Sequence, residues 1–388
     1  MPAGSEAALV AVIGRGVQVA RAAIAAWDAG EAVLPLDPSA PVATRDELLA
    51  RLKPTHVVEG DGERHAFPGG VPVAAGTAAV MVTSGTTGAP KGVELTYDGL
   101  DVMGRGYSTG LDATLDDRWL ACLPLHHVAA LAIIGRAWVT SVPWTAHDTF
   151  DIAAVARSPR DEGTTIMSLV PTTLRRLLDA GAPLHEFRRV IVGGAPCPPA
   201  LRARAEASGV TVVDAYGMTE TWGGFALDGV PIAGADVRIG GDGEILVHGA
   251  MVMRGYRFAP DETAAAIDDG WLHTGDIGTM HDGVVTVIDR KKDVIISGGV
   301  NVSPTRVESV LELHPAVGDV CVVGAPDDEW GERVVAVCVP ASSNATPTLD
   351  ELRAFARDHL AVAHLPRELR IVDSIPRSGG KALRRLLR

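Results

Sequence analysis

The chain has little cysteine, no excess of basic residues and no long apolar run. Its four cysteines (Cys122, Cys197, Cys321 and Cys338) form no Cys-x-x-Cys pair. Three of them stand in apolar surroundings, so we expect buried free thiols rather than a disulfide framework or a zinc site. With 35 Lys and Arg against 48 Asp and Glu, the formal net charge is −13. This charge argues against nucleic acid as the main partner.

The chain also lacks a recognisable membrane or export segment. Arg15 and Arg21 interrupt the apolar stretch near the N-terminus, and no cleavage pattern follows them. The longest later apolar run, residues 128–139, contains Arg136 and is too short to cross a bilayer. We therefore expect a cytoplasmic protein without a membrane partner. We find no internal repeat and no low-complexity tract.

Length and composition fit a multidomain globular enzyme. The 388 residues can form two or three folded units, and 47% hydrophobic with 21% charged residues is ordinary for such a protein. Strand patterns alternate with helical patterns over the first 213 residues, which favours mostly parallel sheets covered by helices. The expected strands are 9–13, 31–36, 57–58, 79–82, 119–123, 165–169, 190–192 and 210–213. The expected helices are 17–29, 153–157, 172–180 and 199–208.

The pattern changes along the second half of the chain. Short β segments at 236–239, 244–248 and 284–288 predict a small β-rich subdomain. From residue 293 we expect a compact α+β unit. Its predicted helices are 303–313 and 349–359, and its predicted strands are 319–324, 333–340 and 370–372. The fold class is therefore α/β: a large N-terminal domain of helix-covered, mostly parallel sheets with a β-rich subdomain, and a small α+β C-terminal domain.

The most informative segment is Thr83-Ser84-Gly85-Thr86-Thr87-Gly88-Ala89-Pro90-Lys91-Gly92, directly after an apolar strand pattern. Glycines let the backbone approach an anion, hydroxyls and N–H groups donate hydrogen bonds, and the lysine adds positive charge. The residues expected to bind phosphates are Thr83, Ser84, Gly85, Thr86, Thr87, Gly88 and Lys91. The spacing differs from Gly-x-x-x-x-Gly-Lys-[Ser/Thr], since Pro90 stands five positions after Gly85. A second candidate, Gly14-Arg15-Gly16, has Val19 where a dinucleotide fingerprint needs glycine.

The loop at 83–92 resembles the signature loop of the adenylate-forming superfamily, which includes acyl-CoA synthetases, luciferases and adenylation domains of peptide synthetases. The resemblance extends from about residue 20 to the C-terminus, with the major motifs in order. It implies a large domain at 1–290, a hinge at 291–292 and a mobile domain at 293–388. Enzymes of this kind join a carboxylate to the α-phosphate of ATP. The carboxylate is already ionised at neutral pH, because its pKa is about 4–5. The site therefore needs cations, Mg²⁺ and oriented donors more than a general base.

Two further motifs of the large domain match the family. In relatives, the segment corresponding to Asp214-Ala215-Tyr216-Gly217-Met218-Thr219-Glu220 binds the nucleotide. By position, Tyr216 would stack on adenine, Thr219 would act near the phosphate, and Glu220 would hold Mg²⁺. Asp214, Ala215, Gly217 and Met218 complete this expected cofactor-binding segment. The turn with Gly194, Ala195 and Pro196 resembles the adenine-flanking turn. Taken alone, these motifs could be a helix cap and an ordinary strand-to-helix turn.

The family pattern continues around the expected hinge. In Gly270-Trp271-Leu272-His273-Thr274-Gly275-Asp276, the resemblance assigns ribose binding to Asp276, while we expect His273 to be structural. In Asp289-Arg290-Lys291-Lys292-Asp293, it makes Arg290 a nucleotide ligand and Lys292 the pivot. A solvated charge cluster is the alternative for the second segment.

The C-terminal domain carries two more candidate elements. Gly298 and Gly299 resemble the glycine pair that lines the pantetheine passage for CoA, and Lys381, on a glycine turn, matches the catalytic lysine of the family. A solvated lysine in a basic tail is the alternative for Lys381. In the large domain, His127 matches the histidine of the family's Pro-x-x-His motif, which borders the acid pocket. We count His127 among the expected catalytic residues. Ala130 stands where relatives often have glycine. Trp222 and Phe225 could shape the pocket or serve as packing residues.

The resemblance implies an ATP-dependent acid–CoA ligase that forms an acyl-AMP and then a CoA thioester. Only 82 residues precede Thr83, fewer than in most relatives, and the segment from Glu220 to Asp236 is compressed. Both features resemble actinobacterial 2-succinylbenzoate–CoA ligases of menaquinone synthesis. Another aryl or alicyclic acid stays open. Also open are a single half-reaction, loading of a carrier-protein thiol, a non-catalytic nucleotide-binding module, and a homodimer.

Overall fold

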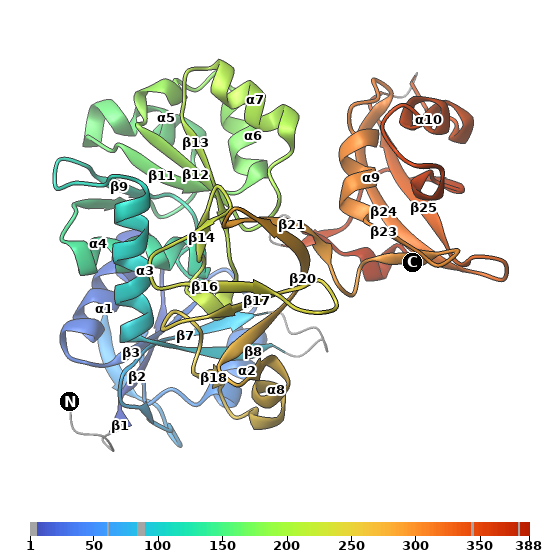
Figure 1. Cartoon of the computed structure of the whole chain (residues 1–388). Helices are drawn as coiled ribbons and strands as arrows, with labels where there is room; N and C mark the ends of the chain where they lie inside the picture. The colour runs from blue at the N-terminus through green and yellow to red at the C-terminus, as the bar shows by residue number, and fades with distance from the viewer. Residues whose placement is uncertain (1–5, 60–61, 84–89, 343–344, 379–380) are drawn as a thin grey trace. The chain divides into compact units, whose positions relative to one another are not determined.

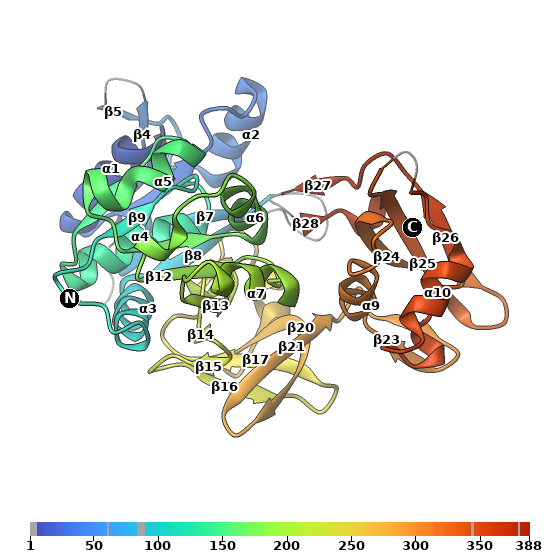
Figure 2. The ribbon, with the colours of Figure 1, turned by 90° about the horizontal axis from the view of Figure 1, so that it is seen from above.

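The computed structural model describes residues 6–59, 62–83, 90–342, 345–378 and 381–388. The chain divides into two compact units, which we call the large unit and the small unit (Figures 1 and 2). The large unit comprises Met1–Arg238, Leu246–His273 and Asp282–Val284. The small unit comprises Ile239–Ile245, Thr274–His281 and Val285–Arg388. The expected hinge at 291–292 lies inside the small unit by this division, and its role as a pivot stays a prediction.

The first sheet of the large unit has seven strands in the order β10-β9-β11-β12-β13-β14-β15. The five from β10 to β13 are parallel to their neighbours, and β14 and β15 are antiparallel additions. The strands are β9 (Trp119–Ala121), β10 (Trp144–Ala146), β11 (Ile166–Leu169), β12 (Arg189–Gly193), β13 (Val212–Tyr216), β14 (Ala226–Leu227) and β15 (Val230–Pro231).

The second sheet of the large unit also has seven strands, in the order β18-β8-β7-β3-β2-β4-β5. Its centre, from β7 to β4, is parallel, and β5, β8 and β18 pair antiparallel with their neighbours. The strands are β2 (Leu9–Ile13), β3 (Ala32–Leu36), β4 (His56–Glu59), β5 (Glu63–Ala66), β7 (Thr77–Thr83), β8 (Lys91–Thr96) and β18 (Gly255–Tyr256). A separate pair is β1 (Glu6–Ala7) with β6 (Val73–Ala74).

Helices cover both faces of these sheets. In Figure 1, α5, α6 and α7 lie beside β11, β12 and β13. Apolar residues of α1, α3 and α4 join one face of each sheet in a single core, and α2 packs on the outer face of the second sheet. The helices are α1 (Gly16–Asp28), α2 (Val42–Leu52), α3 (Tyr97–Gly110), α4 (Val128–Thr140), α5 (Ile152–Glu162), α6 (Pro171–Asp179), α7 (Pro199–Ala207) and α8 (Pro260–Ala266).

Strand β2 shows why these sheets need cover on both faces. Val10 and Val12 belong to the core shared by the two sheets, whereas Leu9, Ala11 and Ile13 belong to the core under α2. Successive side chains of a strand point to opposite faces, so an unbroken apolar run predicts burial on both. The predicted helix-covered, mostly parallel sheets are thus confirmed.

The predicted β-rich segment is also confirmed. Five strands form a sheet in the order β16-β17-β20-β19, with β21 beside β20, and the division between the units passes through it. The strands are β16 (Asp236–Ile239), β17 (Glu244–His248), β19 (Ile267–Asp268), β20 (Trp271–His281) and β21 (Val284–Arg290).

The rest of the small unit is an α+β structure around the long hairpin of β24 (Val317–Asp327) and β25 (Gly331–Pro340). Buried residues of α9 (Pro304–Leu311) and α10 (Leu349–Ala356) pack with this hairpin in one core. Helix α10 begins with a capping box, in which the Thr348 hydroxyl accepts from Glu351 N–H and the Glu351 carboxylate accepts from Thr348 N–H. The other strands are β22 (Ile295–Ser297), β23 (Val300–Val302), β26 (Glu368–Ile371), β27 (Arg377–Ser378) and β28 (Lys381–Ala382).

Two predictions from composition can be compared with the structure. All four cysteines are free thiols; Cys122, Cys321 and Cys338 are buried, as expected, and Cys197 is half-buried. Within the part of the chain that the structure describes, no helix combines the length and apolar character needed to cross a membrane.

Candidate functional site

Several predicted residues of the large unit lie where parallel strands end. In the register of β12 and β13, Gly193 is paired with Ala215, so the turn at Gly194 and the predicted nucleotide-binding segment leave the sheet side by side. Ligands of open α/β sheets bind at this edge, outside the carboxyl ends of the strands. The structure therefore brings together the predicted Gly194, Ala195 and Pro196 with Ala215 and Tyr216.

The segment after β13 is held by local contacts. The Tyr216 ring meets Phe225 edge-on, with centroids 4.7 Å apart. Met218 N–H donates to Thr221 Oγ1 at 3.1 Å at the start of a short 3₁₀ helix, Thr219–Thr221. A Cβ on Gly217 would lie 2.3 Å from the Cα of Gly224. Glycine at 217 therefore allows the two chain segments to approach.

Asp214 has a structural partner. Its carboxylate accepts from the Arg202 guanidinium at 2.5 Å, and the same guanidinium binds Asp228 and Glu206. Burial raises the pKa of Asp214, although Arg202 opposes the change. A nucleotide contact through this side chain stays a prediction.

The predicted phosphate loop is described only at its ends. Thr83 and Lys91 face each other as partners of the antiparallel strands β7 and β8. The predicted residues Ser84, Gly85, Thr86, Thr87 and Gly88 lie outside the described residues. The Lys91 ammonium lies 4.8 Å from the centre of the Tyr256 ring, within cation–π range.

Glu220 is the predicted metal ligand, and its half-buried carboxylate accepts a hydrogen bond from the Tyr256 hydroxyl at 2.8 Å. Among the residues that the structure describes, no group of three or more His, Cys, Asp or Glu side chains could hold a metal. Mg²⁺ commonly uses one or two carboxylates together with substrate phosphates. A single hard carboxylate therefore fits Mg²⁺ bound with a nucleotide.

His127 ends the turn before α4, and its ring centroid lies 4.4 Å from that of His126. Burial lowers the pKa of His126 to about 4. His127 keeps an exposed face, but loss of hydration around the ring lowers its pKa as well. Both imidazoles are therefore neutral at pH 7. Ala130 on α4, and Trp222 and Phe225 beyond the 3₁₀ helix, are fully buried in the large unit's main core.

In the small unit, the predicted ribose ligands are paired with each other. Arg290 Nε lies 2.8 Å from Asp276 Oδ1, and Arg290 Nη1 donates to the carbonyl of Thr274 at 3.1 Å. The Thr274 hydroxyl donates to Ile245 O and accepts from Asp276 N–H. The Asp276 side chain is only 6% exposed. The charge-assisted pair orients one carboxylate at a defined place, which is what recognition of two hydroxyls requires.

The residues beside Arg290 have different roles. Lys291 binds Asp242 at 2.6 Å and Glu244 at 3.0 Å, and Glu244 also accepts from Gly275 N–H. Lys292, the predicted pivot, is exposed, and its carbonyl accepts from Arg388 at 3.3 Å. The motif predicted Arg290 as a ligand and Lys292 as the pivot. It did not indicate that Lys291 would tie this segment to β17.

Gly298 and Gly299 form the turn between β22 and β23, with φ values of +59° and +78°. Positive φ at both central residues is typical of a two-residue hairpin turn. Gly298 N–H donates to the Trp330 carbonyl at 2.8 Å. A Cβ on Gly298 would lie 2.6 Å from the Trp330 ring, whereas a Cβ on Gly299 would have no neighbour within 4 Å.

This difference between neighbouring glycines can be tested with two alanine variants. Gly299→Ala is expected to lower the free energy of unfolding by about 1–2 kcal/mol, because alanine is strained in a left-handed conformation. Gly298→Ala should destabilise the protein by about 1–3 kcal/mol more than Gly299→Ala, because the new methyl group overlaps the Trp330 ring. Denaturant unfolding of both variants measures the difference. Equal destabilisation would contradict the contact with Trp330.

Only the backbone of Lys381 is described. It lies in the hairpin of β27 and β28, opposite Ser378. Both sides of this hairpin are fixed by ion pairs, Arg377 with Asp319 at 2.7 Å and Arg384 with Glu308 at 2.6 Å. The backbone of the predicted catalytic lysine therefore lies between two residues, Arg377 and Arg384, that are held by ion pairs.

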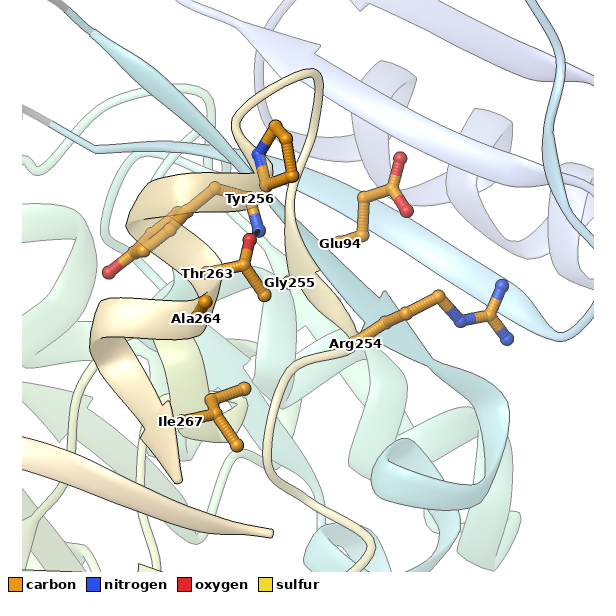
Figure 3. Close-up of a pocket in the computed structure, with 8 residues that line it drawn as sticks. Glu94, Arg254, Gly255, Tyr256, Thr263, Ala264 and Ile267 are labelled. Carbon is orange, nitrogen blue, oxygen red and sulfur yellow. Dashed lines mark hydrogen bonds between the residues drawn. The ribbon is translucent and has the colours of Figure 1, made fainter. Parts of the chain in front are cut away.

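A cavity of about 420 Å³ is lined by Tyr256 together with Glu94, Arg254, Gly255, Thr263 and Ile267, among others. Figure 3 shows the Tyr256 ring extending away from Glu94 and Arg254. None of the predicted site residues lines this cavity. Glu94 is paired with Arg257 at 3.0 Å, and Arg254 binds Thr77 Oγ1 and Ala75 O. These partners account for the charges of the cavity.

Two family models match the chain. The model "AMP-binding enzyme" matches residues 68–257, and the model "AMP-binding enzyme C-terminal domain" matches residues 306–380. The chain is 36% identical over 341 residues to the 2-succinylbenzoate–CoA ligase of Bacillus pumilus, covering 80% of this chain and 68% of the relative. It is 39% identical over 315 residues to the "Probable 2-succinylbenzoate--CoA ligase" of Mycobacterium tuberculosis, covering 78% of this chain and 81% of the relative.

Solved structures with this fold include two complexes of o-succinylbenzoate coenzyme A synthetase from Bacillus subtilis. The complex with the acyl-adenylate intermediate has a TM-score of 0.86 at 28% identity, covering 99% of this chain and 88% of the other. The complex with ATP and magnesium ion has the same TM-score and identity, covering 99% and 90%. ATP-bound MatB from Rhodopseudomonas palustris has a TM-score of 0.87 at 25% identity, covering 99% and 88%.

Proposed function

The chain belongs to the family of AMP-binding enzymes, and we propose that it is an ATP-dependent acid–CoA ligase that acts on 2-succinylbenzoate. The observation that carries the substrate is the shared name of its Bacillus and Mycobacterium relatives, at 36% and 39% identity. Structural similarity alone does not select the acid, because MatB and the Bacillus subtilis synthetase have nearly equal TM-scores. Another aryl or alicyclic acid is the competing substrate.

In the first step, a carboxylate oxygen of the acid attacks the α-phosphorus of ATP, and the bond to pyrophosphate breaks. Lys381 bridges the carboxylate and the α-phosphate, while the loop from Thr83 to Lys91 and Thr219 bind the phosphates. Asp276 and Arg290 hold the ribose, and Tyr216 stacks on adenine beside the turn at Gly194. Glu220 would hold Mg²⁺, which reduces the repulsion between the phosphates and the incoming carboxylate.

In the second step, the sulfur of CoA attacks the carbonyl carbon of the acyl-AMP, and AMP leaves. The C-terminal domain, residues 293–388, turns about Lys292, so that Gly298 and Gly299 border the passage for pantetheine. Such a turn lets one domain serve two steps in succession. His127 borders the acid pocket, and its lowered pKa keeps the ring neutral there. It can therefore pack against an aryl group or donate one hydrogen bond, but it adds no charge at pH 7.

Pyrophosphate exchange with a panel of acids tests the substrate. We expect the highest kcat/KM with 2-succinylbenzoate, and faster exchange with another aryl or alicyclic acid would overturn that choice. Formation of the CoA thioester, measured on the same acids, tests the second step.

The same assays separate the other functions. Thioester formation from supplied acyl-AMP without exchange indicates a single half-reaction. Exchange followed by transfer only to a carrier-protein thiol indicates carrier loading. ATP binding without either reaction indicates a non-catalytic module. We place the enzyme in the cytoplasm, with a homodimer to be tested by its mass in solution.

A further inference from the structure

Tyr256 lies between two residues that the proposed function uses at the phosphates. Its hydroxyl donates to Glu220 Oε1 at 2.8 Å, and the centre of its ring lies 4.8 Å from the Lys91 ammonium. Within the described part of the chain, no ion pair joins Lys91 directly to Glu220. One side chain thus contacts both the predicted metal ligand and the predicted phosphate-binding cation.

The backbone fixes the position of this tyrosine. Tyr256 is paired with Val93 in the antiparallel strands β18 and β8, two residues beyond Lys91. Its N–H donates to Thr263 Oγ1 at 2.9 Å, and that hydroxyl donates to Ala259 O at 2.8 Å. These contacts hold the start of the side chain, and the ring extends away from Glu94 and Arg254 in Figure 3.

The Glu220 backbone is held by the same segment, because Met253 N–H donates to the Glu220 carbonyl at 2.7 Å. The Tyr256 hydroxyl is the donor in its bond to Glu220 Oε1. This bond occupies one carboxylate oxygen of Glu220, Oε1. By fixing that oxygen, the bond also sets the direction of the second carboxylate oxygen.

We propose that Tyr256 is a positioning residue for nucleotide binding: its hydroxyl orients the Glu220 carboxylate toward Mg²⁺, and its ring holds Lys91 toward the phosphates. The inference rests on the proposed function. The same side chain thus contacts a cation through its ring and an anion through its hydroxyl. With the tyrosine in place, both charges remain available to the magnesium–triphosphate ligand.

Two variants separate the hydroxyl from the ring. Tyr256→Phe keeps the ring for Lys91 and loses the bond to Glu220, whereas Tyr256→Leu loses both. ATP affinity, measured by calorimetry at increasing Mg²⁺, is the readout. For Tyr256→Phe we expect the Mg²⁺ concentration for half-maximal ATP binding to rise by about tenfold or more, with binding in the absence of Mg²⁺ unchanged. Tyr256→Leu should also weaken binding without Mg²⁺.

Tyr97→Phe provides the matched control. Its half-buried hydroxyl donates to the carbonyls of Glu31 at 2.6 Å and Trp27 at 3.4 Å, and neither partner is a proposed site residue. Its Mg²⁺ dependence should equal that of the wild type. Thermal unfolding of Tyr256→Phe should change by no more than that of Tyr97→Phe, because each variant loses the hydrogen bonding of one half-buried hydroxyl, whereas only Tyr256→Phe should change the Mg²⁺ dependence.

Two results would overturn the inference. One is a Tyr256→Phe variant with the Mg²⁺ dependence of the wild type. The other is equal loss of ATP binding with and without Mg²⁺. Failure of the proposed function is distinguishable, since a wild-type protein without pyrophosphate exchange for any acid would contradict the function before the variants are compared.

Discussion

Replacement of Lys381 by alanine is expected to reduce pyrophosphate exchange by about a hundred-fold to a thousand-fold, while thioester formation from supplied acyl-AMP is spared. The first step brings a carboxylate to the α-phosphate, and both groups are negatively charged. A lysine that contacts both stabilises the charge that moves between them. The second step starts from a neutral carbonyl, so it does not need this contact.

The anchored hairpin gives the prediction a structural basis. Leu383 N–H donates to the Pro376 carbonyl at 2.8 Å, and the ion pairs of Arg377 and Arg384 hold the strands on either side. These contacts fix the strands from which Lys381 extends, and oriented charge stabilisation requires a fixed support.

Arg385→Ala is the control for this measurement, because it removes an exposed cation from the same segment. It should leave both half-reactions unchanged. Equal losses of exchange and thioester formation in Lys381→Ala would contradict the two-conformation scheme, in which the lysine serves one step only.

The sequence was informative where function depends on short motifs. Asp276 and Arg290 stand in two separate motifs, and the structure brings them to 2.8 Å within the sheet of β20 and β21. Tyr256 carried no such signal. It contacts Glu220 and Lys91, residues distant in the sequence, and a lone aromatic after Gly255 does not reveal either contact.

Among the elements, helix α3 shows why local pattern is not enough. Residues 97–110 contain four glycines, a composition that favours a loop. In the structure these glycines lie at close contacts; for example, a Cβ on Gly106 would lie 2.9 Å from Ile232. Close packing outweighs the low helix propensity, and this packing becomes visible only once the fold is known. Strands such as β2 were predictable because their apolar runs are local.

The second large effect is expected from the ion pair that anchors the same hairpin, whose side chains are largely buried, with 16% of Arg384 and 15% of Glu308 exposed. Arg384 Nη2 contacts both oxygens of Glu308, at 2.6 and 2.7 Å, and Glu308 also accepts from Val322 N–H at 2.7 Å. Arg384→Met should destabilise the small unit by about 3 kcal/mol, the lower end for buried pairs, because it leaves a largely buried carboxylate without its cation. Hydrogen exchange in β24 and β25 measures this loss locally.

The destabilisation of Arg384→Met should depend on pH. Burial already raises the pKa of Glu308, and Arg384 opposes this change. Without the guanidinium the pKa rises further, so the folded state binds a proton more tightly than the unfolded state. Stability is then fully present below the unfolded pKa and is lost as the pH rises through the folded pKa. Thermal unfolding at about pH 5 should therefore show a smaller defect than at about pH 7.5.

A double variant distinguishes the lost charge pair from lost packing. Glu308→Gln combined with Arg384→Met removes both charges, so it should recover much of the stability and lose the added pH dependence. If the single variant is as stable as the double variant at neutral pH, the unpaired Glu308 carboxylate does not destabilise the fold. The ion pair is then not what anchors the hairpin. A loss of pyrophosphate exchange in the single variant that the double variant restores would indicate that the function of Lys381 depends on the pairing of the Arg384 and Glu308 charges.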